Sequence, residues 1–161
     1  MGKKLKAEAE VIINAPLKKV WEFSMDISKI PEFHPRVNKV DYISNKTIRE
    51  EGISYQCNIL EGKGKGTCIE KVTEIIPMEK FTTTIPSDSW GLSKMFENYL
   101  VDTIFTKIDD KTTKIEIIHY FETNTLKAKI IYFFAHGKIN KQTLDTLNGA
   151  KNMIEKEYGN K

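Results

Sequence analysis

The pattern of apolar and polar residues predicts a strand followed by two short helices at the start of the chain. Small and apolar residues alternate with polar ones over 6–14, which is typical of a strand with one buried face. Apolar residues then recur with helical spacing over 17–25, and Pro16 fits the first turn because its missing N–H costs nothing there. A second short helix through Phe33 should end at Pro35, since a residue that precedes proline is disfavoured in helical geometry.

Six further strands, joined by turns, are predicted for the middle of the chain. Alternating or β-branched segments are separated by turn residues such as those at 45–46, 61–64 and 109–111. A polar segment over 87–94, which carries Trp90, is predicted to be a loop and a candidate gate. The six predicted strands are 37–44, 53–60, 67–76, 80–85, 98–108 and 113–123.

The last predicted element is one long helix, and it decides the fold class. Apolar or small residues keep a helical period over about 34 residues. An antiparallel sheet of about seven strands has one face to bury, and this helix is the only predicted element long enough to cover it. We therefore predict an α+β fold in which a curved antiparallel sheet wraps around a C-terminal helix, as a single domain over 1–161. The helix stripe consists of Leu126, Ile130, Phe133, Gly137, Leu144, Leu147, Ile154 and Tyr158.

Composition and charge narrow the class of protein. A chain of 161 residues with 40% hydrophobic and 29% charged residues can bury one ordinary core. Its longest apolar run, 130–135, is too short to cross a bilayer, and its basic start lacks the apolar stretch of a secretory signal. The net charge is +3, but only Arg36 and Arg49 are arginines, which argues against nucleic-acid recognition. Two cysteines are too few for a disulfide scaffold, so a reduced, cytoplasmic location is expected.

The order of the elements and several short motifs resemble the helix-grip superfamily, also called SRPBCC. The motifs are Ile13-Asn14-Ala15-Pro16 with Val20-Trp21, His34-Pro35, Gly64-Lys65-Gly66-Thr67, and the final helix with Leu144, Leu147, Lys151 and Glu155. The superfamily includes START lipid-transfer domains, plant pathogenesis-related allergens and the polyketide cyclase/dehydrase families, and the pattern is closest to the last group. The resemblance covers nearly the whole chain and implies a ligand cavity between the sheet and the final helix. Because the superfamily also includes hormone receptors, oxygenase domains and co-chaperones, it does not choose a reaction.

Side chains that face this expected cavity are the candidate functional residues. On 113–123 the large apolar residues alternate with polar ones, and His119 is the polar member of the inward set. A histidine there can orient a ligand or act as acid or base, or it can be a core residue bonded to a neighbour. Tyr55 and Tyr99 have the same two readings, a hydroxyl in the cavity or a satisfied core side chain. His119 is the candidate catalytic residue, and the expected ligand-binding set is Tyr55, Cys57, Ile59, Tyr99, Val101, Phe105, Ile117, His119, Phe121, Ile130 and Phe133.

The hairpin formed by the predicted strands 53–60 and 67–76 has two possible registers. A four-residue turn pairs Cys57 with Cys68 and turns Glu70 inward, whereas a five-residue turn shifts the pairing and turns Lys71 inward. Either inward charge should be paired, lie at a wet cavity mouth or meet a ligand, because a buried unpaired charge is strongly destabilising. The two cysteines and the scattered histidines lack the clustered spacing of a zinc site, so neither a metal nor a cofactor is expected.

Three functions remain open from the sequence. The first is binding or transport of a hydrophobic small molecule such as a lipid, polyketide or isoprenoid. The second is an enzyme of the polyketide cyclase/dehydratase type that uses His119 and a cavity tyrosine. The third is an interaction module like the co-chaperone or quinone-chaperone members, for which the lysine-rich surface is the only support. We expect no nucleic-acid partner and no integral membrane association, and we favour a monomer while the oligomeric state stays open.

Overall fold

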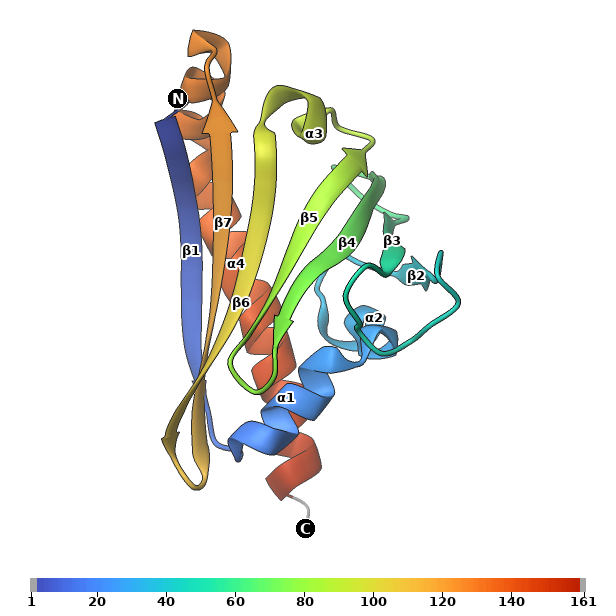
Figure 1. Ribbon diagram of the computed structural model, residues 1–161, viewed down its shortest axis with the longest axis vertical. Coiled ribbons are helices and arrows are strands. Elements are labelled where there is room, and N and C mark those ends of the chain that lie inside the picture. Colours follow the sequence, from blue (N-terminus) through green and yellow to red (C-terminus); the bar gives the residue numbers. More distant parts are fainter. Residues whose placement is uncertain (1–2, 160–161) are drawn as a thin grey trace.

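A seven-stranded antiparallel sheet and one long helix form the frame of the molecule. The computed structural model describes residues 3–159 of the chain and the side chains of 4–158. The strand order is β1-β7-β6-β5-β4-β3-β2, so the first strand pairs with the last. Figure 1 shows the sheet in front of the long C-terminal helix α4. The elements are β1 Lys3–Ile13, α1 Leu17–Met25, the 3-10 turn η1 Ile27–Lys29, α2 Ile30–Phe33, β2 Lys39–Asp41, β3 Ser54–Ile59, β4 Gly66–Ile76, β5 Lys80–Asp88, α3 Leu92–Met95, β6 Glu97–Asp109, β7 Thr112–Thr123 and α4 Leu126–Gly159.

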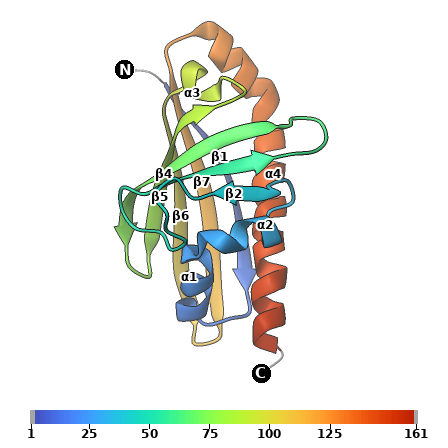
Figure 2. The same ribbon diagram turned by 90° about the vertical axis from the view of Figure 1, so that its right-hand side faces the viewer.

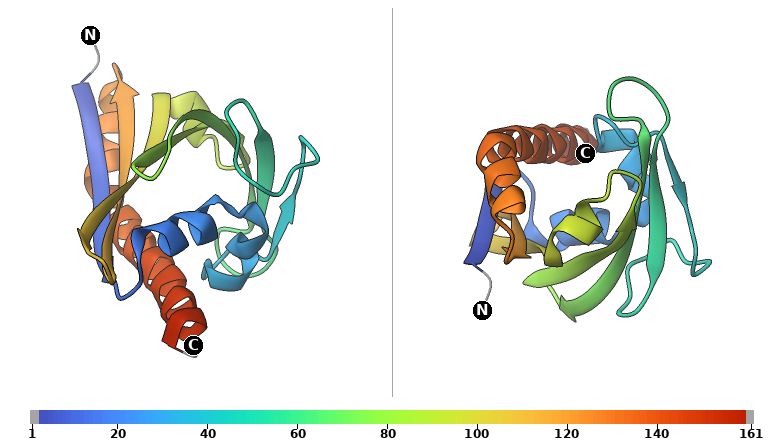
Figure 3. Two further views of the ribbon diagram at one scale, coloured as in Figure 1. Left: turned by 60° about the horizontal axis from the view of Figure 1, so that its bottom comes forward. Right: turned by 90° about the horizontal axis from the view of Figure 1, so that it is seen from above.

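The sheet curls around one side of α4, which confirms the predicted architecture. Seen from above, the strands curve away from α4 on one side and return towards it on the other (Figure 3). The short helices α1 and α2 close the lower end between the sheet and α4 (Figure 2). Neither α4 nor any other helix over residues 3–159 is long and apolar enough to cross a membrane.

The local signals near the start of the chain are mostly confirmed. Helix α1 has the predicted bounds, but Pro16 is its N-cap residue in extended geometry and not part of the first turn. The Asp26 carboxylate accepts a hydrogen bond from the Ser28 backbone N–H at 2.9 Å and so begins the 3-10 turn. His34, which precedes Pro35, is extended, with ψ of 124°.

Two predictions about the middle of the chain are wrong. The strand expected over 37–44 is only three residues long, because β2 pairs only with the middle of β3. The polar segment over 87–94 is not a simple loop. Strand β5 runs into it as far as Asp88, and the helix α3 occupies its end. The Asp88 carboxylate accepts hydrogen bonds from the backbone N–H groups of Trp90, Leu92 and Ser93, which fixes this turn.

The β3–β4 hairpin adopts the register with the four-residue turn. Cys57 pairs directly with Cys68, and Tyr55 pairs with Glu70. Gly62 and Gly64 in the turn have φ of 79° and 84°, a left-handed geometry that glycine adopts without strain. Glu70 therefore points to the inner face of the sheet, which settles the alternative that the sequence left open.

The predicted apolar stripe of α4 is wrong over the first half of the helix. Leu126, Ile130 and Phe133 are 73%, 50% and 69% exposed. The inner face is formed instead by a second helical series that begins at Ala128, which is fully buried. Small alanines allow α4 to lie close to β1, whereas the larger residues of the predicted stripe point outward. In the second half, Leu147 and Ile154 are confirmed at 2% and 1% exposed, whereas Leu144 is 39% exposed and does not belong to the core.

The two glycines of α4 give a matched test of this packing. A Cβ at Gly149 would lie 2.1 Å from the Phe33 carbonyl oxygen, whereas a Cβ at Gly137 would meet no atom within 4 Å. We expect Gly149→Ala to lower the free energy of unfolding by about 1–3 kcal/mol through overpacking. Gly137→Ala should raise it by about 0.5–1 kcal/mol through helix propensity. Urea unfolding of both variants measures the difference, and equal effects would contradict the close approach of α2 to α4.

Candidate functional site

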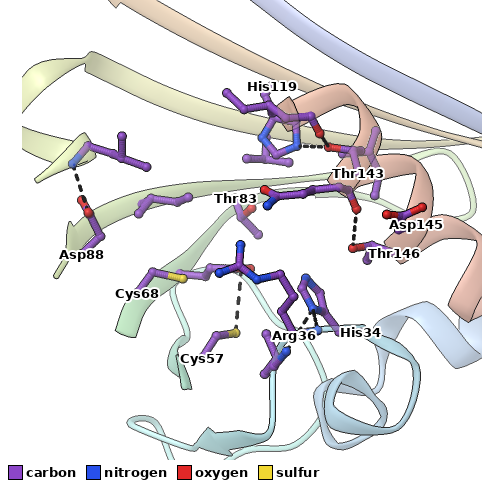
Figure 4. Close-up of a pocket in the computed structure, with 18 of the residues that line it drawn as sticks. His34, Arg36, Cys57, Cys68, Thr83, Asp88, His119, Thr143, Asp145 and Thr146 are labelled. Carbon is purple, nitrogen blue, oxygen red and sulfur yellow. Dashed lines mark hydrogen bonds between the residues drawn. The ribbon is translucent and has the colours of Figure 1, made fainter. Parts of the chain in front are cut away.

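A cavity of about 820 Å³ lies between the concave face of the sheet and α4. Its size falls within the range of about 300–1,000 Å³ that is usual for small-molecule sites. Most of its walls are apolar. Polar side chains project from several elements, and Figure 4 shows His34 and Arg36 facing Thr143 and Asp145 across the space. The cavity is therefore the candidate binding site of the protein.

Seven of the eleven predicted binding residues line this cavity. Strands β3, β6 and β7 expose alternate residues to the concave face, as their period of two requires. The polar exception on β7, His119, points into the cavity from between Ile117 and Phe121. The seven residues are Cys57, Ile59, Tyr99, Val101, Ile117, His119 and Phe121.

Four predicted residues do not line the cavity. Ile130 and Phe133 lie on the outer face of α4 and are exposed. Phe105 lies on the inner face of β6 but packs in an aromatic cluster with Trp21, at a centroid distance of 5.1 Å, where α1 covers it. Tyr55 is fully buried, because Arg49 lies over its ring at 5.5 Å. Alternation predicts the face of a side chain, but it does not predict what covers that side chain.

A chain of hydrogen bonds joins β6, β7 and α4 inside the cavity. The Tyr99 hydroxyl lies 3.0 Å from His119 Nδ1. His119 Nε2 lies 3.1 Å from Thr143 Oγ1 (Figure 4). Thr143 donates its own hydroxyl proton to the Ile139 carbonyl at 2.8 Å, so its oxygen must accept from His119. His119 therefore carries its proton on Nε2, and Nδ1 accepts from Tyr99.

Burial keeps this chain neutral. Burial lowers the pKa of His119 to about 4, so the imidazole is uncharged at neutral pH. Burial also raises the pKa of Tyr99 above its ordinary value, which keeps the phenol protonated. Each of the three side chains in this hydrogen-bond chain donates its proton to an acceptor of the protein. The arrangement is thus suited to holding a ligand in one orientation, and the Tyr99 oxygen retains acceptor capacity towards it.

The inward charge of Glu70 is balanced by a second buried group that the sequence analysis did not identify. Arg49 Nη2 donates to the Tyr55 hydroxyl at 3.0 Å, and this hydroxyl donates to Glu70 Oε2 at 2.5 Å. Arg49 is only 8% exposed and also donates to the Ser24 carbonyl. Tyr55 thus links a buried cation to a carboxylate on the cavity wall. Nothing in the pattern around Arg49 predicts its burial, because it follows a turn and not an alternating strand.

Cys57, Cys68 and Glu70 form the group on the cavity wall that is best suited to hold a soft metal ion. Their ligand atoms lie within 4.8 Å of one another, and Figure 4 shows the two thiols on neighbouring strands. The hydrogen bond with Cys68, burial and the nearby carboxylate together raise the pKa of the Cys57 thiol well above its ordinary value. The thiol is therefore protonated at neutral pH unless a cation displaces its proton.

His34 and Arg36 hold one edge of the cavity in place. His34 Nδ1 accepts from the backbone N–H groups of Arg36 and Val37, both at 3.1 Å. Burial lowers the pKa of His34 to about 4, so this nitrogen stays available as an acceptor. The Arg36 guanidinium donates to the Lys63 carbonyl at 3.1 Å and so ties this edge to the β3–β4 turn.

Of all the elements, α4 supplies the largest group of cavity-lining residues that the sequence analysis missed. One helical series there supplies apolar wall, and its period was available in the sequence as an alternative to the predicted stripe. Its alanine spacing is the signal that would have identified it. The cavity-lining residues of this series are Ile131, Tyr132, Ala135 and Ile139, followed by Gln142, Thr143 and Thr146.

Comparison with known proteins supports a family and a fold. A family model described as polyketide cyclase/dehydrase and lipid transport matches residues 4–144. No curated protein matches the chain significantly.

Several solved structures are similar to the chain. A norcoclaurine synthase point mutant from Thalictrum flavum, in complex with a transition-state analogue, has 10% identity and a TM-score of 0.79, with 98% of each chain covered. The ZhuI aromatase/cyclase from a Streptomyces species has 14% identity and a TM-score of 0.73, covering 97% of this chain and 96% of that one. A conserved protein from Geobacillus kaustophilus has 20% identity and a TM-score of 0.70, covering 94% of this chain and 96% of that one. At these identities the likeness shows the helix-grip fold alone.

The buried, neutral state of His119 should make stability depend on pH. The folded protein protonates His119 only near its pKa of about 4, whereas the unfolded chain does so near the ordinary value of 6.5. The neutral His119 side chain therefore contributes its full stabilisation above pH 6.5, and this contribution is lost as the pH falls towards 4. Because of His119, the unfolding free energy of the wild type should fall by about 2 kcal/mol between about pH 7 and pH 5, and His119→Gln should not show this part of the fall.

Urea unfolding at both pH values measures this change. His136→Gln, which replaces an exposed histidine of α4, is the matched control for the loss of an imidazole. The same pH dependence in His119→Gln and in the wild type would contradict the buried neutral state.

Proposed function

Because the chain belongs to the polyketide cyclase/dehydrase and lipid transport family, we propose that it binds one hydrophobic small molecule between its sheet and α4. The observation that carries the proposal is the cavity of about 820 Å³ with mostly apolar walls. Lipids, polyketides and isoprenoids match this space in size and polarity. Binding, or transport of the bound molecule, requires no reactive group beyond those that orient the ligand.

The size of the cavity supports a bound occupant. Extrapolating ~24 cal/mol per Å³ gives on the order of 20 kcal/mol for a dry, empty cavity of about 820 Å³. This exceeds the whole net stability of a typical domain, about 5–15 kcal/mol. The space must therefore hold water or a ligand. Water finds few polar partners along apolar walls, so an apolar ligand is the better occupant.

The polar groups on the walls indicate where the ligand carries its own polar group. The Tyr99 hydroxyl gives its proton to His119, so the free lone pair of its oxygen accepts. A hydroxyl on the ligand would donate to it. The remaining walls select for apolar surface, so the proposed ligand is a largely hydrocarbon or polycyclic molecule with a hydroxyl at one end.

A bulky side chain inside the cavity should weaken ligand binding. Ala135 lines the cavity from α4, whereas Asn148 is exposed on the same helix and does not line it. We expect the purified wild-type protein to carry a stoichiometric hydrophobic adduct by native mass spectrometry, and an organic extract to identify its class. Ala135→Trp should lower the fraction of protein that carries the adduct, because the indole takes up part of the space, and the control Asn148→Trp should leave that fraction unchanged. An unchanged fraction in Ala135→Trp would place the ligand elsewhere and overturn the proposal.

The pair of Tyr99 and His119 favours a cyclase- or dehydratase-type enzyme as the second candidate. If a substrate carbonyl replaced His119 Nδ1 as the acceptor of the Tyr99 hydroxyl, which now lies 3.0 Å from that nitrogen, the phenol could donate its proton to the carbonyl oxygen. The freed Nδ1 could then take up a proton from the adjacent substrate carbon, so that an enol forms. Incubation of the protein with aromatic polyketide precursors, followed by mass spectrometry, tests for turnover. We expect both Tyr99→Phe and His119→Gln to lower any turnover by at least about a hundredfold, typical of a general acid–base group. Unchanged turnover in both variants would exclude this role.

A further inference from the structure

The first half of α4 carries large apolar side chains that the rest of the described chain leaves uncovered. Leu126, Ile130, Phe133 and Phe134 are 73%, 50%, 69% and 78% exposed. Their spacing of four, three and one residues places them on one face of the helix. Gly137 continues this face, and a Cβ built there would meet no atom within 4 Å. We name Leu126, Ile130, Phe133 and Phe134 the α4 patch.

The α4 patch is a cluster, and single exposed apolar residues elsewhere do not resemble it. Four of the twelve large exposed apolar side chains of the described chain fall within nine residues of α4. With about 150–250 Å² for each aromatic side chain, the patch exposes on the order of 500 Å² of apolar surface. The largest patch on a monomer is typically about 300–600 Å² and is often functional. The α4 patch is therefore as large as the largest patch of a typical monomer, and its surroundings decide which partner fits it.

The surroundings of the α4 patch are basic. No Asp or Glu occurs from 123 to 144, whereas four lysines and one histidine do. Lys141 pairs with Asp145 at 2.9 Å. Lys127, Lys129 and Lys138 form no ion pair with any residue whose side chain the structure describes. Exposed aromatic and aliphatic side chains beside unpaired lysines are typical of helices that lie on anionic membranes.

The same helical turns form part of the cavity wall. On the side opposite the patch, Ile131, Tyr132, Ala135 and Ile139 line the cavity. Lys138 is four residues after Phe134 and so its neighbour on the helix surface. Because Lys138 is exposed and also lines the cavity, the patch lies beside an edge of the cavity. In Figure 2 these turns are drawn in orange and form the upper right margin of the molecule. A surface that binds the patch would therefore lie next to the cavity wall.

We propose that the α4 patch is a docking site for the surface of an anionic phospholipid bilayer. The four apolar side chains enter the acyl region, and Lys127 and Lys129 lie beside lipid phosphates. The role of this docking rests on the proposed function. Docking would bring the cavity next to the bilayer, which supplies or receives the hydrophobic ligand. A second copy of the chain fits less well, because a symmetric contact would bring the same unpaired lysines together.

Vesicle co-sedimentation tests the proposal with the full chain. The probes are vesicles of phosphatidylcholine alone and of phosphatidylcholine mixed with phosphatidylglycerol. We expect the wild type to bind the anionic vesicles more tightly, and salt to weaken this binding. The double variant Phe133→Ser/Phe134→Ser should lower the partition coefficient by at least about tenfold, since it removes two inserted rings. Lys127→Glu/Lys129→Glu should lower it by roughly tenfold or more on anionic vesicles only.

The control variant removes two other exposed apolar side chains, at the other end of the sheet. Ile12 and Ile108 are each 51% exposed, at the lower ends of β1 and β6 in Figure 1. Ile12→Ser/Ile108→Ser should bind vesicles as the wild type does. Circular dichroism and thermal unfolding confirm that each variant is folded.

Three outcomes would overturn the proposal. The first is equal binding of the wild type to neutral and anionic vesicles. The second is that Phe133→Ser/Phe134→Ser binds vesicles as tightly as the wild type does. The third is a wild-type dimer that dissociates in this variant, which would assign the patch to a contact with a second copy. Vesicle binding without any cavity ligand would overturn only the proposed function. The patch variants leave the cavity-lining residues unchanged, so their retention of the hydrophobic adduct, measured as above, separates the two proposals.

Discussion

The concave face of the sheet is wider than the single helix that crosses it, and this mismatch creates the cavity. Seven strands about 4.8 Å apart span roughly 29 Å, whereas a helix with its side chains is about 10–12 Å across. Aromatic side chains fill the space left beside the helix at the two ends of the sheet. Trp21 packs on Phe105 at a centroid distance of 5.1 Å at one end, and Phe96 packs on Phe121 at the same distance towards the other. Between these clusters the side chains leave the cavity of about 820 Å³ open.

The open space imposes a second constraint on the polar residues that face it. Such residues have limited access to bulk water, so the protein must satisfy their hydrogen bonds itself. His119 does so through Tyr99 and Thr143, and Glu70 does so through Tyr55. The first set of bonds joins the sheet to α4 across the cavity. The same bonds that satisfy the wall therefore fix its shape, and a ligand meets a preorganised surface.

The sequence was sufficient for the fold and for the inward faces of β6 and β7, because both follow from local periodicity. Tyr99, Val101, Ile117 and His119 alternate along β6 and β7, and all four line the cavity. Tertiary packing decided the rest. The side of α4 that faces inward depended on how closely Ala128 approaches β1, and two helical series compete there.

The hairpin register and the burial of Tyr55 also lay beyond local periodicity. The register depended on a single residue in a glycine-rich turn, since Gly62 and Gly64 permit more than one turn length. The burial of Tyr55 depended on Arg49, which lies six residues away outside any regular strand and covers the ring. Neither contact leaves a periodic signal in the sequence.

The two halves of α4 bury different amounts of apolar side chain in the core. The half that buries less lies between the cavity and the exposed α4 patch. The second half packs Leu147, Ala150 and Ile154 into the core, and Gly149 lies against the backbone of α2. The first half has Ala128 as its fully buried contact and turns its large side chains outward. A segment with few buried apolar contacts opens at a lower free-energy cost than the rest of a fold. The part of the cavity wall that can move most cheaply is therefore the part whose outer face is apolar and basic. Under the proposed function, a ligand that entered or left at this end of the cavity would pass beside the apolar side chains of the α4 patch.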